Sequence, residues 1–303
     1  MRIAGESAVS ILVNVLVGGL AIGSIYAMMA IGFSLLWQTS RTINFAQGDF
    51  ATAVAFVFVG LSVSLGLAAG IAAGLAVVFA MVVLGWAVRK TVIAKLINRG
   101  VLSLVVATIA LSILIQNFFV VFWTPQALSA PGLVSARVLH FGAVVISVRD
   151  IVNLAVATLM ITVLQAFLHL TKIGKALRAT AQNAAVARVI GIDPARMITV
   201  AFVVNAALVA VAAVLLAPIY LVQYNMGTQL GLNAFYAAII GGFNRVRGAF
   251  VGGLVVGLLE SISAAYISTQ YQTGVVVAFL MAMLLIKPEG LLGQKELVRE
   301  YQG

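Results

Sequence analysis

The feature that most limits how this chain can fold is a succession of long apolar runs separated by short polar segments. The longest runs cover residues 9–37, 50–88, 102–123, 151–170 and 197–220. A helix needs roughly 20 apolar residues to cross a bilayer, and it satisfies its own backbone polar groups there. Only 9% of the residues are charged, against roughly 25% in soluble domains. The sequence therefore predicts an all-α polytopic membrane protein.

The runs also set the expected number of crossings. Run 50–88 has room for two spans that divide near Gly66, and runs 249–267 and 271–286 complete the membrane region. Run 230–243 is short for a full crossing. We expect about eight to nine transmembrane helices, one or two of them broken or short, in a single domain over residues 1–303.

Two basic segments orient the chain in the membrane. Segment 89–100 carries four Lys or Arg residues and no acid, and segment 172–196 carries five, with Asp193 as its single acid. Cytoplasmic loops are enriched in Lys and Arg, so both segments should be cytoplasmic. Counting from them places the N-terminus and loop 124–150 outside, the loop with room for a short surface helix. The C-terminus is inside if run 230–243 crosses.

Segment 172–196 is also the longest polar stretch between apolar runs. Its Ala-rich middle predicts a short helix that ends at Gly191, and Asp193-Pro194 predicts the cap and first residue of the next helix. Two interpretations stay open. The segment is either a solvated loop that obeys the charge bias, or a docking helix for a cytoplasmic partner.

Enzyme chemistry finds no support in the sequence. The two histidines, His140 and His169, are far apart and belong to no ligand motif, and the chain has no cysteine. Gly174-Lys175 lacks the remaining residues of a phosphate loop, so we expect any ATP to be hydrolysed elsewhere. No cofactor or metal is expected. The Lys and Arg residues that give the net charge of +10 lie between apolar runs. This pattern indicates membrane orientation and not nucleic-acid binding.

Polar residues inside the apolar part are the candidates for a transport path. Asn44, Gln47 and Asp49 lie between spans too close together for a free loop, which predicts a helix break lined by protein or water. Capping the next helix is the expected job of Asp49. Glu260 lies near mid-membrane, where a charge is costly. It lines the path or is hydrogen-bonded to Ser or backbone groups between helices.

Glycines at four-residue spacing predict faces where helices approach closely. Two pairs lie in the last third of the chain and two sets lie near its beginning, and all are expected to pack against neighbouring helices. The sets are Gly248/Gly252, Gly253/Gly257, Gly19/Gly23 and Gly66/Gly70/Gly74.

Three segments together resemble a known family. GSIYAMMAIGFSLLWQTSRTINFAQGDF, LRATAQNAAVARVIGID and IIGGFNRVRGAFVGGLVVGLLES, the last followed by LLIKPEGLLG, are similar to segments of permease subunits of branched-chain amino acid ABC importers. Asn44, Phe45, Gly48 and Asp49 match the opening motif. In the second segment the resemblance implies contact with an ATPase through Arg178, Ala181, Ala185, Arg188 and Gly191.

The resemblance implies a mechanism and partners. The chain would move a small polar solute inward by alternating access, in a bacterial inner membrane, with two cytoplasmic ATP-binding subunits, a second and commonly different permease, and an external solute-binding protein. The solute would be a branched-chain or related amino acid, an amide, urea or an organic acid. Gln47 stands where the family often has His, and residues 244–247 replace a Gly-Ser-rich turn, which leaves the solute open. The alternative is a self-sufficient secondary transporter or channel.

Overall fold

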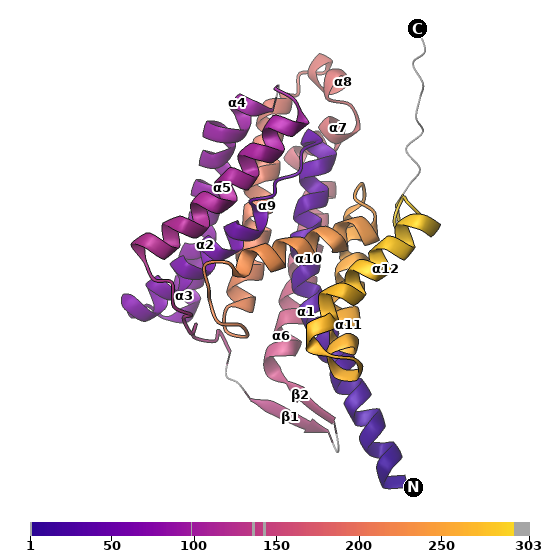
Figure 1. Cartoon of the computed structure of the whole chain (residues 1–303). Helices are drawn as coiled ribbons and strands as arrows, with labels where there is room; N and C mark the ends of the chain where they lie inside the picture. The colour runs from indigo at the N-terminus through magenta and orange to yellow at the C-terminus, as the bar shows by residue number, and fades with distance from the viewer. Residues whose placement is uncertain (1, 98, 135–136, 142–143, 294–303) are drawn as a thin grey trace.

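In a computed structural model, which describes residues 2–97, 99–134, 137–141 and 144–293, the chain forms a helical bundle with one small β-hairpin (Figure 1). Eight segments of the described chain are helical, long and apolar enough to cross a membrane. The predicted all-α membrane fold is therefore confirmed. The spans are Ser10–Ser40, Gln47–Ser64, Ala69–Leu96, Val101–Phe122, Val148–Leu170, Pro194–Leu216, Val246–Tyr266 and Thr269–Ile286.

The first half of the chain contains the predicted break. Helix α1 (Arg2–Ser40) runs the length of the molecule, and the chain turns back into the bundle before α2 (Gln47–Val59) begins (Figure 1). The chain turns at Gly66, whose φ of +66° favours glycine. The elements that follow α2 are η1 (Gly60–Ser64), α3 (Ala69–Phe79), η2 (Ala80–Ala87), η3 (Arg89–Ile93), α4 (Ala94–Leu96) and α5 (Val101–Phe122).

The loop after α5 contains a β-hairpin in place of the expected surface helix. Strands β1 (Val138–Phe141) and β2 (Val144–Ser147) pair antiparallel, with Val138 opposite Ser147. The run Val144-Val145-Ile146 is β-branched, which favours extended backbone over helix. A bridge between Leu128 and Val222 ties the same loop to the segment after α9.

The second half places the cytoplasmic segment and the short helix. Helix α6 (Val148–Leu170) leads into α7 (Lys172–Gln182) and α8 (Ala184–Val189), and α9 (Pro194–Leu216) returns. Helix α10 (Met226–Gly241) has 16 residues and lies across the bundle (Figure 1), which confirms the expected short helix. Three elements complete the described chain: α11 (Val246–Tyr266), η4 (Thr269–Tyr271) and α12 (Gln272–Ile286).

The two basic segments lie at one end of the molecule, as the charge pattern predicts. In Figure 1, α4, α7 and α8 share this end, whereas the first turns of α1 and the β-hairpin share the other. Helices α4 and α8 belong to the two basic segments whose Lys and Arg residues orient the chain. We therefore name the end with α7 and α8 cytoplasmic and the opposite end external.

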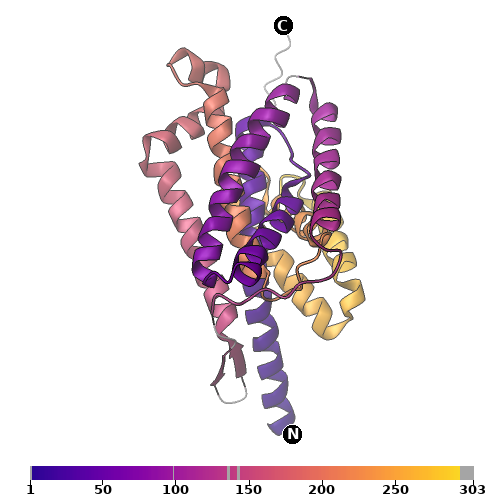
Figure 2. The ribbon, with the colours of Figure 1, turned by 90° about the vertical axis from the view of Figure 1, so that its left-hand side faces the viewer.

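Burial separates a central group of helices from a peripheral one. Helix α1 packs against α9, α10 and α11, and α2 packs against α9 and α10. Of the residues in span Gln47–Ser64, 72% are buried within the chain, against 22% for α5 and 17% for Thr269–Ile286. Figure 2 shows α5 and α6 on opposite sides of this centre. The peripheral helices keep apolar faces for lipid or another subunit.

Candidate functional site

The centre of the bundle is held by glycines on two faces of α11. A Cβ atom at Gly252 would overlap the carbonyl oxygen of Ala237 in α10, and one at Gly248 would overlap that of Gly241. On the other face, a Cβ at Gly253 would overlap Ala27 in α1. Gly257 likewise meets α1, at Gly23 and Gly19. Helix α10 therefore packs directly against Gly248 and Gly252, and α1 packs directly against Gly253 and Gly257.

The backbone of the helix break, residues 41–46, is lined by protein. Asn44 accepts a hydrogen bond from the Ala46 amide through Oδ1 at 3.1 Å, and the Phe45 amide donates to Thr108 Oγ1 at 3.3 Å. Gln47 Nε2 donates to the Met29 carbonyl at 2.8 Å. These bonds satisfy backbone groups that lipid could not.

Asp49 does not cap α2, so that expectation is wrong. The N-cap residue of α2 is Ala46, which makes no side-chain capping bond. The Asp49 carboxylate instead accepts hydrogen bonds from two residues of α5, the Ser112 hydroxyl and Gln116 Nε2, the latter at 3.0 Å. Gln116 Nε2 also donates to Thr228 Oγ1 of α10 at 3.0 Å. Asp49 thus joins α2 to a peripheral helix.

A cavity of about 170 Å³ lies beside Asp49, between α1, α2, α5 and α10. We name it the Asp49 cavity. Phe45 of the helix break lines it, together with Phe33 of α1 and Phe235 of α10. The predicted residues Phe45 and Asp49 therefore face one space, whereas Asn44 and Gln47 are buried behind it.

Glu260 faces a second cavity, of about 500 Å³, on the other side of α10. Asn233 Nδ2 donates a hydrogen bond to Glu260 Oε1 at 2.6 Å, and the Tyr26 hydroxyl is a further partner. Gln272 Nε2 reaches the Glu260 carbonyl at 3.4 Å. Glu260 is hydrogen-bonded between helices and also lines a cavity, but its partners are not the Ser or backbone groups expected.

Helix α10 is the wall between these two cavities. Thr228 and Phe235 face the Asp49 cavity, and Gln229 and Asn233 face the Glu260 cavity. Sequence reasoning missed both faces, because α10 was considered for its length alone. The signal was present in the run MGTQLGLNAFYAAIIG, where Gln and Asn recur inside an apolar segment.

The cytoplasmic segment contains two capped helices where one was expected. The Thr171 hydroxyl accepts from the Gly174 amide at 2.9 Å, and Asn183 Oδ1 accepts from Ala185 and Val186 amides at 3.0 Å each. Asn183 therefore ends α7 and starts α8, because a capping side chain favours a new helix.

The predicted end of this segment agrees with the structure. Gly191 has a φ of +84° after α8, and Asp193 Oδ1 caps α9 by accepting from the Ala195 amide at 2.9 Å. Pro194 is at the first position of α9. The local pattern of cap, proline and terminal glycine is thus correct, because each depends on residues a few positions apart.

The five predicted coupling residues are divided between α7 and the segment that follows Asn183. Arg178 and Ala181 line a cavity of about 550 Å³ that also contains Arg245 and Arg247 of the turn between α10 and α11. The other three, Ala185, Arg188 and Gly191, are exposed on α8 and the residues after it.

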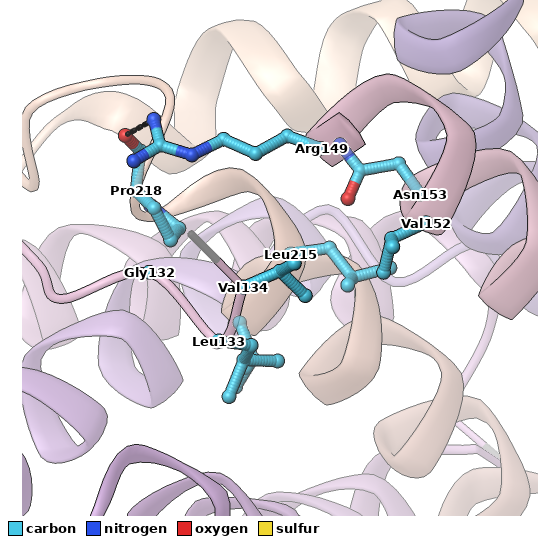
Figure 3. Close-up of a pocket in the computed structure, with 9 residues that line it drawn as sticks. Gly132, Leu133, Val134, Arg149, Val152, Asn153, Leu215 and Pro218 are labelled. Carbon is cyan, nitrogen blue, oxygen red and sulfur yellow. Dashed lines mark hydrogen bonds between the residues drawn. The ribbon is translucent and has the colours of Figure 1, made fainter. Parts of the chain in front are cut away.

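A small cavity near the external end can be set aside as a solute site. Figure 3 shows it between Leu133, Val152 and Leu215, with Arg149 above donating to the Pro218 carbonyl at 3.4 Å. Its volume of about 20 Å³ is room for roughly one water molecule. The two cavities beside α10 are therefore the stronger candidates for a transport path.

Comparison with known proteins agrees with this arrangement of helices. One solved structure with a matching fold is PsaBC from Streptococcus pneumoniae in complex with Fab, at a TM-score of 0.52 and 15% identity, covering 92% of each chain. Among curated proteins, the high-affinity branched-chain amino acid transport system permease protein LivH of Escherichia coli (strain K12) is 31% identical over 291 residues. That match covers 92% of this chain and 94% of LivH.

Two further comparisons extend the likeness over nearly the whole chain. The permease protein BraD of Pseudomonas aeruginosa is 32% identical over 293 residues, covering 93% of this chain and 95% of BraD. A family model described as "Branched-chain amino acid transport system / permease component" matches residues 15–286. The resemblance drawn from the three sequence segments is thus confirmed. This chain is a multi-pass inner-membrane protein that belongs to the family of branched-chain amino acid transport permeases.

Proposed function

We propose that this permease carries a branched-chain or related amino acid inward by alternating access, driven by ATP that partner subunits hydrolyse. The partners are two cytoplasmic ATP-binding subunits, a second permease subunit and an external solute-binding protein. The relatives LivH and BraD are described as parts of high-affinity branched-chain amino acid transport systems, which supports this solute class. The chain itself supplies the path for the solute and the cytoplasmic helices whose movement opens that path.

The observation that carries the proposal is the exposed apolar face of α8 at the cytoplasmic end. Val186, Val189 and Ile190 expose 56%, 86% and 67% of their surface, and Arg188 lies between them in sequence. Helix α8 projects beyond the bundle (Figure 1). Exposed apolar residues rimmed by charge mark a protein-interaction surface. This favours the docking interpretation of segment 172–196 over the solvated loop.

Helix α7 offers a route from α8 to the centre of the bundle. It packs against α1, α6 and α9, and Gly174 lets it lie directly on the end of α6, because a Cβ there would overlap the Phe167 carbonyl. Arg178 and Arg245 line one cavity, so a shift of α7 acts on the turn that joins α10 to α11. Those two helices carry Asn233 and Glu260.

The test is whether α8 holds the ATP-binding subunits. Val189→Asp places a charge in the exposed apolar face without touching a membrane span. We expect co-purified ATP-binding subunits to fall by about tenfold or more, which corresponds to a loss of about 1.4 kcal/mol, while the permease still inserts. Val145→Asp, at an exposed position of β2 at the external end, is the matched control and should retain them.

Two results would contradict the proposal. In the first, a double variant with Val189→Asp and Arg188→Glu retains ATP-binding subunits at the wild-type level. Segment 172–196 would then be a solvated segment and not a docking surface. Solute uptake that continues in liposomes without ATP or those subunits would support the self-sufficient transporter.

A further inference from the structure

The Asp49 cavity contains a buried carboxylate and offers it no cation. Asp49 exposes 1% of its surface, and its described hydrogen-bond partners, Ser112 and Gln116, are neutral. The described residues that line the cavity include no Lys, Arg or His. Burying an ionised carboxylate is costly unless a positive group pairs with it.

Three aromatic rings, those of Phe33, Phe45 and Phe235, line the same cavity. The Phe235 ring lies 5.8 Å from Phe45 and 5.7 Å from Phe33, measured between ring centroids. Phe243 continues the series, 5.7 Å from Phe235 and 5.7 Å from Trp37 near the cytoplasmic end of α1. Such rings bury apolar groups and also attract cations over their faces.

A lining that combines one carboxylate with phenyl rings selects a particular kind of solute. It must carry a positive group and an apolar group a few atoms apart, and it must fit about 170 Å³. An α-amino acid with a branched aliphatic side chain has both groups. Urea, amides and organic acids lack the positive group, so they would form no ion pair with Asp49.

We propose that the Asp49 cavity is a binding site for the transported amino acid, where Asp49 receives its ammonium group and Phe33, Phe45 and Phe235 receive its side chain. This inference rests on the proposed import of an amino acid. It separates the roles of the two carboxylates beside α10. Asp49 binds the solute, whereas Glu260 joins α11 to α10 through Asn233 and to α1 through Tyr26.

The absence of native cysteine permits a direct test in the assembled transporter, reconstituted in liposomes with its partners. Ile109→Cys places a thiol in the lining of the cavity. Ile113→Cys, one turn along α5 and 55% exposed, is the matched control outside it. We expect leucine to slow labelling of the cysteine at 109 by a small thiol reagent and not that at 113. The same carbon skeleton without the ammonium group, 4-methylpentanoate, should not slow either.

Asp49→Asn, combined with Ile109→Cys, tests the charge. We expect the leucine concentration needed for protection to rise by about 10- to 100-fold, the range for losing a charged hydrogen bond, with ATP-binding subunits still attached. If this variant does not assemble, Phe45→Ala decides. The Phe45 side chain is 36% exposed, and its removal should also weaken protection by about tenfold, as for a lost apolar contact.

The outcomes separate the two proposals. If the wild-type complex imports no leucine, the proposed solute class is wrong. If it imports leucine but leucine does not protect the cysteine at 109, or if Asp49→Asn assembles and protects like wild type, the assignment of this cavity is wrong. Equal protection by 4-methylpentanoate would also overturn the role of Asp49.

Discussion

Helices α11 and α3 both carry glycines at four-residue spacing, but the two helices use them differently. On α11, Gly248, Gly252, Gly253 and Gly257 each approach the backbone of a neighbouring helix so closely that a Cβ would overlap it. On α3 and the turn before it, the set Gly66/Gly70/Gly74 meets nothing within 4 Å. The expectation that this early set packs against another helix of the chain is therefore wrong.

The difference shows what glycine spacing means in a membrane helix. Spacing by four puts small residues on one face, which permits a close approach but does not supply a partner. On α11 the second pair begins at the residue after the first pair ends, so the two pairs form two faces, one for α10 and one for α1. On α3 the buried residues are Ala72 and Ala76, and the glycines lie on the outward side.

The largest expected effect is at the α10–α11 contact. Gly252→Leu must push α10 away, because the overlap is with backbone that cannot rotate aside. We expect destabilisation by about 3 kcal/mol or more, at the upper end of overpacking costs, and little folded protein by size-exclusion chromatography. Val255→Leu, at a partly buried position of α11, adds only one methylene to an existing side chain, so this control should give near wild-type yield. Equal yields would mean that α10 and α11 do not pack as described.

A smaller effect is expected where side chains join the same two helices. Glu260→Leu removes the acceptor of Asn233, and leaving a buried polar group unpaired costs about 1–3 kcal/mol. Glu260→Gln keeps an acceptor oxygen and nearly the same volume, so thermal stability of the purified complex should change little. Uptake should also survive Glu260→Gln. Loss of uptake with normal stability would place Glu260, and not Asp49 alone, on the solute path.

The smallest effect is expected on α3. Gly74→Leu adds the same side chain as Gly252→Leu, but it points into open space, so folded yield of the single permease should stay at wild-type level. The informative measurement is recovery of the complete complex. If Gly74→Leu folds normally but the second permease no longer co-purifies with it, the glycines on α3 pack against another subunit. The contrast with α11 would then disappear.

Features that depend on near neighbours in sequence were predictable. The turn at Gly66, the cap at Asp193 and the glycine at 191 were all placed correctly, since each follows from a few consecutive residues. The β-hairpin of the external loop and the division of the cytoplasmic segment into α7 and α8 differ from the expectation, because the β-branched run 144–146 favours a strand and Asn183 caps a second helix. The location of both basic segments at one end of the molecule was predictable from Lys and Arg alone.

The candidate site shows where local reasoning ends. Asp49 was expected to cap its own helix, yet Ser112 and Gln116, more than 60 positions away in sequence, donate to it. Glu260 was expected to bond locally, yet Asn233 of α10 is its partner. No periodicity in either segment could reveal these pairs, because they form only when α2 meets α5 and α10 meets α11.

The sequence by itself determined that this protein crosses a membrane many times, that its two basic segments lie at one end, and which family it resembles. Those properties follow from apolar length, charge and short motifs, all of which are sums over nearby residues. The tertiary structure alone decided that α10 separates two cavities, that each cavity has one carboxylate, and which glycine rows touch another helix. In lipid, apolar side chains face membrane and neighbouring helices at similar cost, so hydrophobicity does not choose helix partners. Backbone approach and a few polar pairs make that choice, and both depend on how distant segments meet.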